Sequence, residues 1–159
     1  MQTYCLNTNP SYTVPGLSVS YRPVTALAAY PRNARTHSKR QIRQIAESIS
    51  AFGFTNPILI DAGNTIVAGH GRLLAAQLLG MTDVLTIRLE SLTETQIRAY
   101  VLADNKLAEN AGWDESILAI ELQHLLTIDL GFDVTVTGFE VPEIDLIIQE
   151  ATSRPSADR

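Results

Sequence analysis

Residues Asn64–Leu79 read NTIVAGHGRLLAAQLL, and this stretch determines the architecture that we expect around it. Its first half, Thr65–Ala68, is short and β-branched, which favours a buried strand. Its second half, Leu73–Leu79, consists of strong helix formers. Gly69 and Gly71 lie at the junction, where residues without a β-carbon let the chain turn sharply and approach a ligand closely. We therefore expect a strand, a tight turn and a helix in succession.

The start of this helix is a candidate anion site. The first N–H groups of a helix have no partner within it, and the positive end of the helix dipole lies there. Arg72 adds a planar guanidinium whose donors match a phosphate group, and the helix that follows is almost wholly apolar. These residues predict a phosphate-bearing ligand. The alternative is a plain strand-to-helix turn with Arg72 in solvent, because short glycine motifs also occur by chance.

The composition indicates a single folded domain. The chain has 159 residues, enough for one full-sized core and too few for two ordinary domains. Its net charge is -5, so any contact with DNA would be local rather than spread over the surface. Cys5 is the only cysteine, which excludes an intramolecular disulfide and fits a reducing compartment. Without a signal peptide or an apolar run of membrane-spanning length, we expect a cytoplasmic protein with no membrane partner.

Capping residues and apolar periodicity predict the elements before the central stretch. Residues 1–21 show no clear period, and we interpret them as a leader or an edge segment. Residues 24–30 are a weak strand candidate, ended by a proline because the residue before a proline avoids the helical region. A helix is expected over 39–52, with Ser38 as its N-cap and Gly53 as a left-handed C-cap.

The central stretch is expected to lie between further strands and helices. Residues 57–60 and 65–68 flank a turn sequence and predict a β-hairpin. Another strand is expected over 84–89. Thr93 and the glutamine three residues later form a capping box, which predicts a helix to about Ala103.

Asp104 raises a question about the end of that helix. If the helix continues, Asp104 falls on the apolar stripe of Ile97, Val101 and Ala108. A buried carboxylate without a partner is unfavourable, so it would need a cation, a metal or several hydrogen-bond donors. The alternative, which the residues alone favour, is a break at Asp104 followed by a short helix to Asn110.

The C-terminal third is expected to be mainly helical. A helix is predicted over 115–127, with Ile117 and Ile120 on its apolar stripe. Residues 132–139 are expected to be a short extended piece. Pro142 then starts a last amphipathic helix, since proline is suited to the first helical position.

Three stretches stand in a recognisable order: Asn33–Arg35 before a helix, Gly69–Arg72 at the start of a second, and Asp104–Lys106 at the end of a third. With the helix, glycine and strand block of 41–58, they resemble the ParB/sulfiredoxin superfamily, in particular the ParB-like N-terminal domain. The tail is similar to that of phage-type ParB-like domains found alone or fused to DNA methyltransferases. The resemblance implies an α+β fold, with a small mixed sheet, packed helices and a short helical C-terminal extension.

The resemblance also suggests how the chain is organised. Partitioning ParB proteins continue into a helix-turn-helix and a dimerisation domain, and we expect no room for both in this chain. The oligomeric state stays open, with a homodimer among the alternatives. The expected parts are a leader over 1–22, the ParB/sulfiredoxin-like domain over 23–112, the helical extension over 113–150 and a flexible tail over 151–159.

A nucleotide site is implied by the same resemblance. In ParB-type members the glycine box cradles the triphosphate of CTP, and an acidic residue followed by asparagine helps to hold the divalent metal. Carried over by position, Asp104 and Asn105 would hold Mg²⁺ on bound CTP or ATP, with His70 and Asp104 as candidate catalytic residues. The expected phosphate and nucleotide ligands are Asn33, Arg35, Gly69, His70, Gly71, Arg72, Asn105 and Lys106.

The sequence differs from the family pattern in two ways, and both restrict the family functions that can be assigned to its residues. The ParB box reads Gly-Glu-Arg-Arg, whereas His70 and Gly71 replace the acidic residue and one arginine here, so the charge at the triphosphate is reduced. In sulfiredoxins the catalytic cysteine occupies the position of His70. Because that chemistry requires a thiolate, the chain is not expected to be a sulfiredoxin.

Three functions are weighed on this basis. The leading one is a nucleotide–Mg²⁺ module, with at most slow hydrolysis, that controls contact with DNA or a DNA methyltransferase. The second is a metal-dependent nuclease, for which the only carboxylates to join Asp104 are Asp61, Glu47 and Glu109. The third is a non-catalytic adaptor that binds DNA or an acidic partner through basic residues, chiefly Arg32, Lys39, Arg40 and Arg43.

Overall fold

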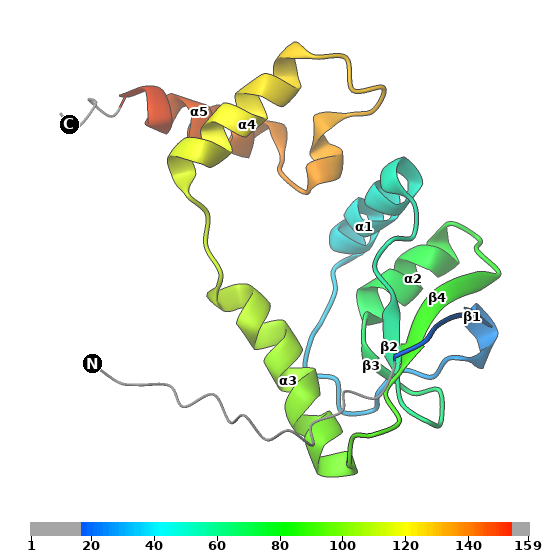
Figure 1. The fold of residues 1–159 in the computed structure, drawn as a ribbon. Helices are drawn as coiled ribbons and strands as arrows, with labels where there is room; N and C mark the ends of the chain where they lie inside the picture. Colours follow the sequence, from blue (N-terminus) through cyan, green and yellow to red (C-terminus); the bar gives the residue numbers. More distant parts are fainter. Residues whose placement is uncertain (1–16, 154–159) are drawn as a thin grey trace, which may run out of the picture.

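A four-stranded mixed sheet in the order β1-β4-β2-β3 forms the centre of the fold (Figure 1). Strand β1 (Val19–Pro23) pairs antiparallel with β4 (Asp83–Arg88), which pairs parallel with β2 (Ile58–Ile60). Strand β3 (Ile66–Ala68) completes the β2–β3 hairpin. The computed structural model describes residues 17–153; Cys5 lies outside this range. The expected α+β class and the hairpin are confirmed.

Helices α1 (Lys39–Phe52) and α2 (His70–Leu78) pack against each other beside the sheet (Figure 1). The N-cap expected for α1 is confirmed, because Ser38 Oγ accepts a hydrogen bond from Gln41 N at 3.1 Å. Gly53 ends α1 with φ +87° and ψ 171°, a conformation outside the left-handed helical region that was expected. The main core cluster lies between the sheet and α2 and consists of Val24, Ile58, Ile60, Ile66, Leu73, Ala76 and Val84.

The chain between β1 and α1 differs from the prediction. A 3-10 helix, η1 (Val24–Ala26), replaces the expected strand over 24–30, and only Ala28 forms an isolated bridge, with Thr65. The change follows from Pro23, which lacks an N–H group and ends β1, and from Val24 N, which donates to Thr82 O at 2.9 Å. Strand β1 lies at the sheet edge, and all of it except Pro23 falls in the segment expected over 1–22.

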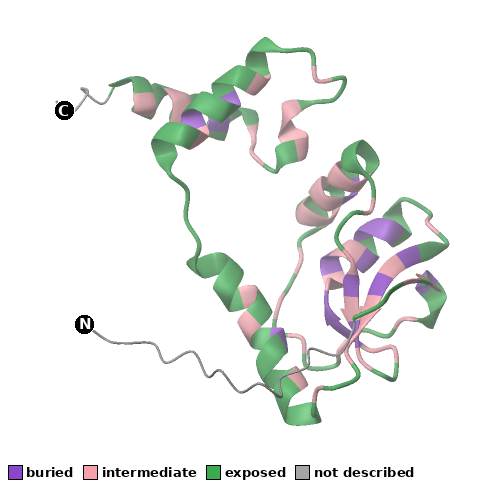
Figure 2. Cartoon of the chain, viewed as in Figure 1, coloured by how far each residue is buried: buried purple, intermediate pink, exposed green. Residues whose placement is uncertain are grey.

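Helix α3 (Glu94–Asn110) is one continuous helix, so the favoured break at Asp104 was wrong. The capping box at its start is confirmed. Val101 is buried, but Asp104 and Ala108 are exposed, because the second half of α3 extends away from the sheet (Figure 2). Asp104 therefore needs no buried partner, since solvent reaches its carboxylate.

Helices α4 (Glu115–Thr127) and α5 (Val141–Ser153) pack against each other at a distance from the sheet (Figure 1). The apolar stripe predicted for α4 was wrong: Ile117 and Ile120 are exposed, whereas Ala119 and Leu122 are buried. The reason is tertiary, because α4 packs on α5 through its other face. Helix α5 also extends to Ser153, into the segment that was expected to be a tail.

Between these helices the chain returns to α1. A 3-10 helix, η2 (Val134–Thr137), replaces the extended piece expected over 132–139, since Asp133 caps it and Gly138 ends it at φ +93°. Glu140 Oε1 lies 2.7 Å from Arg40 Nη2 and accepts a hydrogen bond from Gln44 Nε2 at 2.9 Å. The C-terminal segment is thus attached to α1. Within residues 17–153, no helix has the length and apolarity to cross a bilayer.

Candidate functional site

One small polar cavity unites the three stretches that the sequence singled out. It has a volume of about 130 Å³ and lies where α2 begins, between the segment before α1 and the middle of α3. Side chains or backbone from all three stretches line it: Asn33, Arg35, Gly69, His70, Gly71, Arg72, Asp104 and Asn105. These residues come from segments up to about seventy positions apart, so only the fold brings them together.

The start of α2 is open to an anion. Gly69 precedes the helix at φ +104° and ψ 25°, and no side chain caps the helix there. The first N–H groups of α2 therefore point outward without a capping acceptor. A β-carbon on Gly69 would lie 2.8 Å from Arg72 Nη2, so the glycine also leaves room for the guanidinium.

Arg72 lies across this helix start and has a buried nitrogen without a hydrogen-bond partner. Its Nη2 donates to Pro57 O at 2.9 Å, whereas its buried Nε has no partner. Burial lowers the pKa of the Arg72 guanidinium, and the negative charge of Asp104 acts in the opposite direction. The ion pairs among residues 17–153 do not include Arg72 with Asp104. A buried donor without an acceptor is unfavourable, so an anionic ligand would complete this site.

Gly71 explains how closely α1 and α2 approach each other. A β-carbon at this position would lie 2.9 Å from Ile45 Cδ1 and 3.0 Å from His37 Cε1. The second glycine of the box is thus required by helix packing, which places His37 and Ile45 on the cavity wall.

His70 is held in one orientation by the backbone. Its Nε2 accepts a hydrogen bond from Tyr30 N at 3.1 Å, which assigns the proton of the neutral ring to Nδ1. Burial lowers the pKa of His70, and the charge of His37 lowers it further. His70 therefore offers a donor at Nδ1 and has no free lone pair in this tautomer. This favours the role of phosphate ligand among those expected for His70, over that of a general base.

A second pocket of about 380 Å³ adjoins the cavity and shares Asn33, Arg35 and Asn105 with it. Lys106, which does not line the cavity, lies here together with Glu109. The Asn33 side chain forms a local turn, since its Oδ1 accepts from Arg35 N at 3.1 Å. The expected nucleotide ligands therefore fall into two adjoining spaces.

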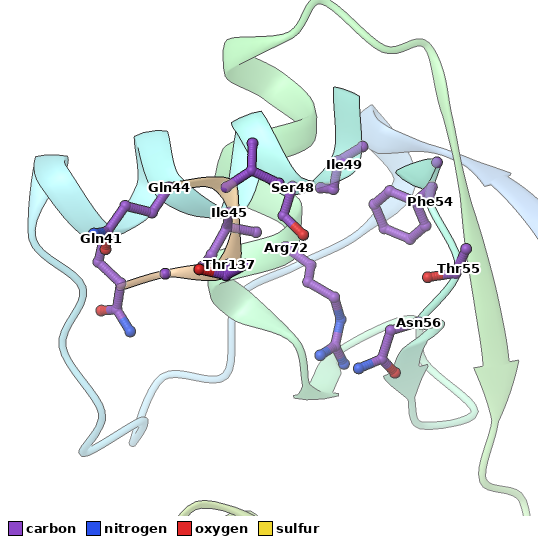
Figure 3. Close-up of a pocket in the computed structure, with 13 residues that line it drawn as sticks. Gln41, Gln44, Ile45, Ser48, Ile49, Phe54, Thr55, Asn56, Arg72 and Thr137 are labelled. Atoms are coloured by element: carbon purple, nitrogen blue, oxygen red, sulfur yellow. The ribbon is translucent and has the colours of Figure 1, made fainter. Parts of the chain in front are cut away.

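A groove of about 420 Å³ lies on the other side of Arg72, between α1 and η2 (Figure 3). Arg72 extends toward Asn56 at this groove, which Gln44, Ser48 and Thr137 also line. These lining residues were not predicted from the sequence. The spacing of Gln41, Gln44 and Ser48 along α1 was a usable signal, because it gives one polar helix face. Nothing local indicated that Thr137 would join them.

The oxygen ligands that α3 offers fit Mg²⁺ only together with a phosphate ligand. Asp104 offers a carboxylate, and Asn105 offers its side-chain oxygen, because its Nδ2 donates to Val101 O at 2.8 Å. Mg²⁺ commonly takes one or two carboxylates and fills its other positions with water and substrate phosphates. Within the described part of the chain, no three His, Cys, Asp or Glu side chains are grouped to hold a metal.

The carboxylates nominated for a nuclease do not gather around Asp104. Asp61 Oδ1 accepts from Gly63 N and Thr65 N at 2.8 Å and shapes the hairpin turn. Glu47 lines a different groove on α1. Glu109 forms ion pairs with Arg35 and Lys106. A site with several clustered carboxylates is therefore not formed by these residues.

The basic residues nominated for DNA do not form one surface. Arg32 lies beside the β2–β3 turn, whereas Lys39, Arg40 and Arg43 are on α1. Arg40 is paired with Glu140. Lys39 and Arg43 are exposed and remain candidates for DNA or partner contact.

Two protein families match successive parts of the chain. A family described as the ParB N-terminal domain matches residues 13–106. A family described as the ParB-methyltransferase HTH domain matches residues 116–159. The second match covers α4, η2 and α5, which were expected only as a helical extension.

Individual proteins are also similar to parts of the chain. The chain is 51% identical over 80 residues to the ParB-like nuclease domain-containing protein YnaK of Escherichia coli (strain K12). The matched stretch covers 50% of this chain and 92% of YnaK. The chain is also 35% identical over 79 residues to a probable chromosome 2-partitioning protein ParB of Deinococcus radiodurans. This match covers 48% of this chain and 27% of the Deinococcus protein. The C-terminally truncated ParB of Caulobacter crescentus, complexed with CTP-gamma-S, has a similar fold: the TM-score is 0.70 at 21% identity, over 87% of this chain and 81% of that one.

Proposed function

The chain belongs to the ParB N-terminal domain family, and from this premise we propose that it binds a nucleoside triphosphate, CTP or ATP, with Mg²⁺. Binding would control its contact with DNA or with a DNA methyltransferase. The Caulobacter ParB of similar fold was complexed with CTP-gamma-S, and we carry over its ligand class as a proposal. Any hydrolysis would be slow, because the box carries His70 where the family has an acidic residue.

The observation that carries the proposal is the convergence at the start of α2. The helix has no side-chain cap, and the buried Nε of Arg72 has no acceptor. The helix start and Arg72 thus both present hydrogen-bond donors without acceptors, and a phosphate group supplies acceptors to several donors at once. Asn33, Arg35 and Asn105 approach the same cavity from two other segments.

We assign the rest of the nucleotide to the neighbouring spaces. The cavity of about 130 Å³ is too small for a whole nucleoside triphosphate, but Arg72 also lines the groove between α1 and η2. We place the phosphates at α2 and the base and sugar in this groove, where polar side chains and Phe54 are available. Asp104 and Asn105 would hold Mg²⁺ against the phosphates, and bound Mg²⁺ would neutralise part of their charge.

Calorimetric titration with CTP and ATP, each with Mg²⁺, tests this proposal. We expect Arg72→Ala to weaken binding by about 10- to 100-fold, the range for losing a hydrogen bond to a charged group. Arg98→Ala is the matched control, because Arg98 is an exposed arginine on α3 that lines none of these spaces. Equal affinity of the wild type and Arg72→Ala would contradict the proposed site.

DNA binding is the second proposed function, and the match of residues 116–159 to the ParB-methyltransferase HTH domain favours it. Phosphate contacts make DNA affinity fall steeply with salt. We expect the affinity for DNA to fall with salt, and we expect a shallower dependence for the double substitution Lys39→Ala and Arg43→Ala, because it removes two exposed cations of α1. An affinity for duplex DNA that does not respond to salt would argue against a phosphate-binding surface.

A further inference from the structure

Glu109 connects the two cations that flank the outer pocket. Its Oε1 accepts a hydrogen bond from Arg35 Nη1, and its Oε2 lies 3.4 Å from Lys106 Nζ. Arg35 reaches this carboxylate from the segment before α1, whereas Lys106 is on α3, three residues earlier than Glu109. One carboxylate thus ties two segments together across the pocket. We call this arrangement the Glu109 clasp.

The Glu109 clasp lies beside the proposed phosphate position. Arg35 lines both the cavity at α2 and the outer pocket, and Glu109 and Lys106 line the outer pocket. A chain of phosphates that starts at α2 would therefore reach Arg35 and Lys106 as it lengthens. The last phosphate of that chain would meet the carboxylate of Glu109, which has the same sign of charge.

From this arrangement we infer that Glu109 is an internal stand-in for the terminal phosphate, which must displace it to reach Arg35 and Lys106. The inference rests on the proposed nucleotide function and adds a residue that competes with the terminal phosphate and therefore weakens triphosphate binding more than monophosphate binding. Hydrogen bonds from Lys106 and then Arg35 lower the pKa of Glu109, so it is ionised at neutral pH. The side chains of Arg35 and Glu109 are 37% and 46% exposed, so solvent weakens the pair and a multiply charged phosphate can replace it.

Two variants of Glu109 separate the clasp from a simple effect of charge. Glu109→Gln removes the negative charge and weakens both contacts. Glu109→Asp keeps the charge, but the shorter side chain cannot span Arg35 and Lys106 in the same way. Glu121→Gln on α4 is the control, because it makes the same change in net charge away from the pocket.

The experiment measures the affinities of CTP, CDP and CMP, and of the adenine series, for the four proteins with Mg²⁺. We expect both Glu109 variants to bind the triphosphate about two- to fivefold more tightly, as fits the release of an exposed pair. The gain should be smaller for the diphosphate and absent for the monophosphate, and Glu121→Gln should match the wild type.

Three outcomes would overturn the inference. A gain in Glu109→Gln without one in Glu109→Asp would mean that only the charge matters. Unchanged affinity in both variants, with measurable binding by the wild type, would refute the competition between Glu109 and the terminal phosphate and leave the proposed function standing. Absence of nucleotide binding in all four proteins would refute both.

Discussion

The guanidinium of Arg72 occupies the space that a side chain on Gly69 would need: a β-carbon on Gly69 would lie 2.8 Å from Nη2 and 3.1 Å from Cζ of the arginine. The guanidinium therefore folds back over the residue that precedes its own helix. From there it donates to the carbonyl of Pro57, at the end of the loop that leads into β2. The glycine at this position thus serves the arginine as well as the turn.

Replacing Gly69 by alanine should displace Arg72 and weaken ligand binding. Gly69 has φ +104°, so alanine is also strained there, and we expect a loss of about 1–3 kcal/mol in the free energy of unfolding. Gly80→Ala is the control, since Gly80 has φ +69° with no atom near its β-carbon position. Calorimetry should show weakened nucleotide binding for Gly69→Ala and not for Gly80→Ala. Urea unfolding should show a lower free energy of unfolding for both variants. Wild-type affinity in Gly69→Ala would refute the steric relation.

Gly71→Ala should destabilise the contact between α1 and α2. Alanine normally stabilises a helix interior relative to glycine, so a loss would come from crowding. The new methyl group would meet Ile45 Cδ1 at 2.9 Å, and we expect a loss of about 1–3 kcal/mol. Ile45→Val removes that Cδ1 atom, so the double variant should recover part of the loss. Urea unfolding of the double-mutant cycle measures this coupling, and strictly additive effects would contradict it.

His70 should titrate below the ordinary histidine value of 6.5. Burial disfavours the charged ring, and the charge of His37 disfavours it further, so the folded state binds its proton less readily than the unfolded state. The contribution of His70 to stability is therefore intact above pH 6.5 and declines as the pH falls toward its lowered pKa. NMR titration of the ring should show this pKa, and ring nitrogen shifts should place the proton on Nδ1. A His70 pKa above 6.5 would contradict this account.

Glu140→Gln should loosen the attachment of η2 and α5 to α1. A hydrogen bond from Arg40 lowers the pKa of Glu140, so the contact contributes stability above the unfolded pKa and loses it as the pH falls through the folded one. We expect faster amide exchange in η2 and at the start of α5, measured by hydrogen exchange. Glu150→Gln, an exposed charge change near the end of α5, should leave exchange in η2 unchanged. Equal exchange in Glu140→Gln and the wild type would show that other contacts hold the segment.

Local chemistry was sufficient to predict most of the elements around the site. The hairpin follows from two short apolar runs around a turn sequence, and α1 and α3 begin at their predicted caps. The glycine box was recognisable because a β-branched run gives way to strong helix formers within four residues. The errors at 24–30 and 132–139 occurred where a proline or an Asp cap, with its neighbouring contacts, outweighed weak strand propensity.

Other features depend on contacts between distant segments. The buried face of α4 is set by α5, so Ile117 and Ile120 are exposed although their spacing predicts a packed stripe. Asp104 lies in solvent because the second half of α3 leaves the sheet, a fact that its own sequence does not encode. Thr137 joins the groove because the segment around η2 packs on α1, where Phe52 contacts Phe132 and Arg40 pairs with Glu140.

The residue types at the start of α2 are a property of the sequence, because turns, caps and helix propensity act over a few neighbouring positions. Their meeting with Asn33, Arg35 and Asn105, and the pairing of Arg35 with Glu109, belong to the tertiary structure. The physical reason is that burial and charge pairing depend on distances in space, which packing of the whole chain determines.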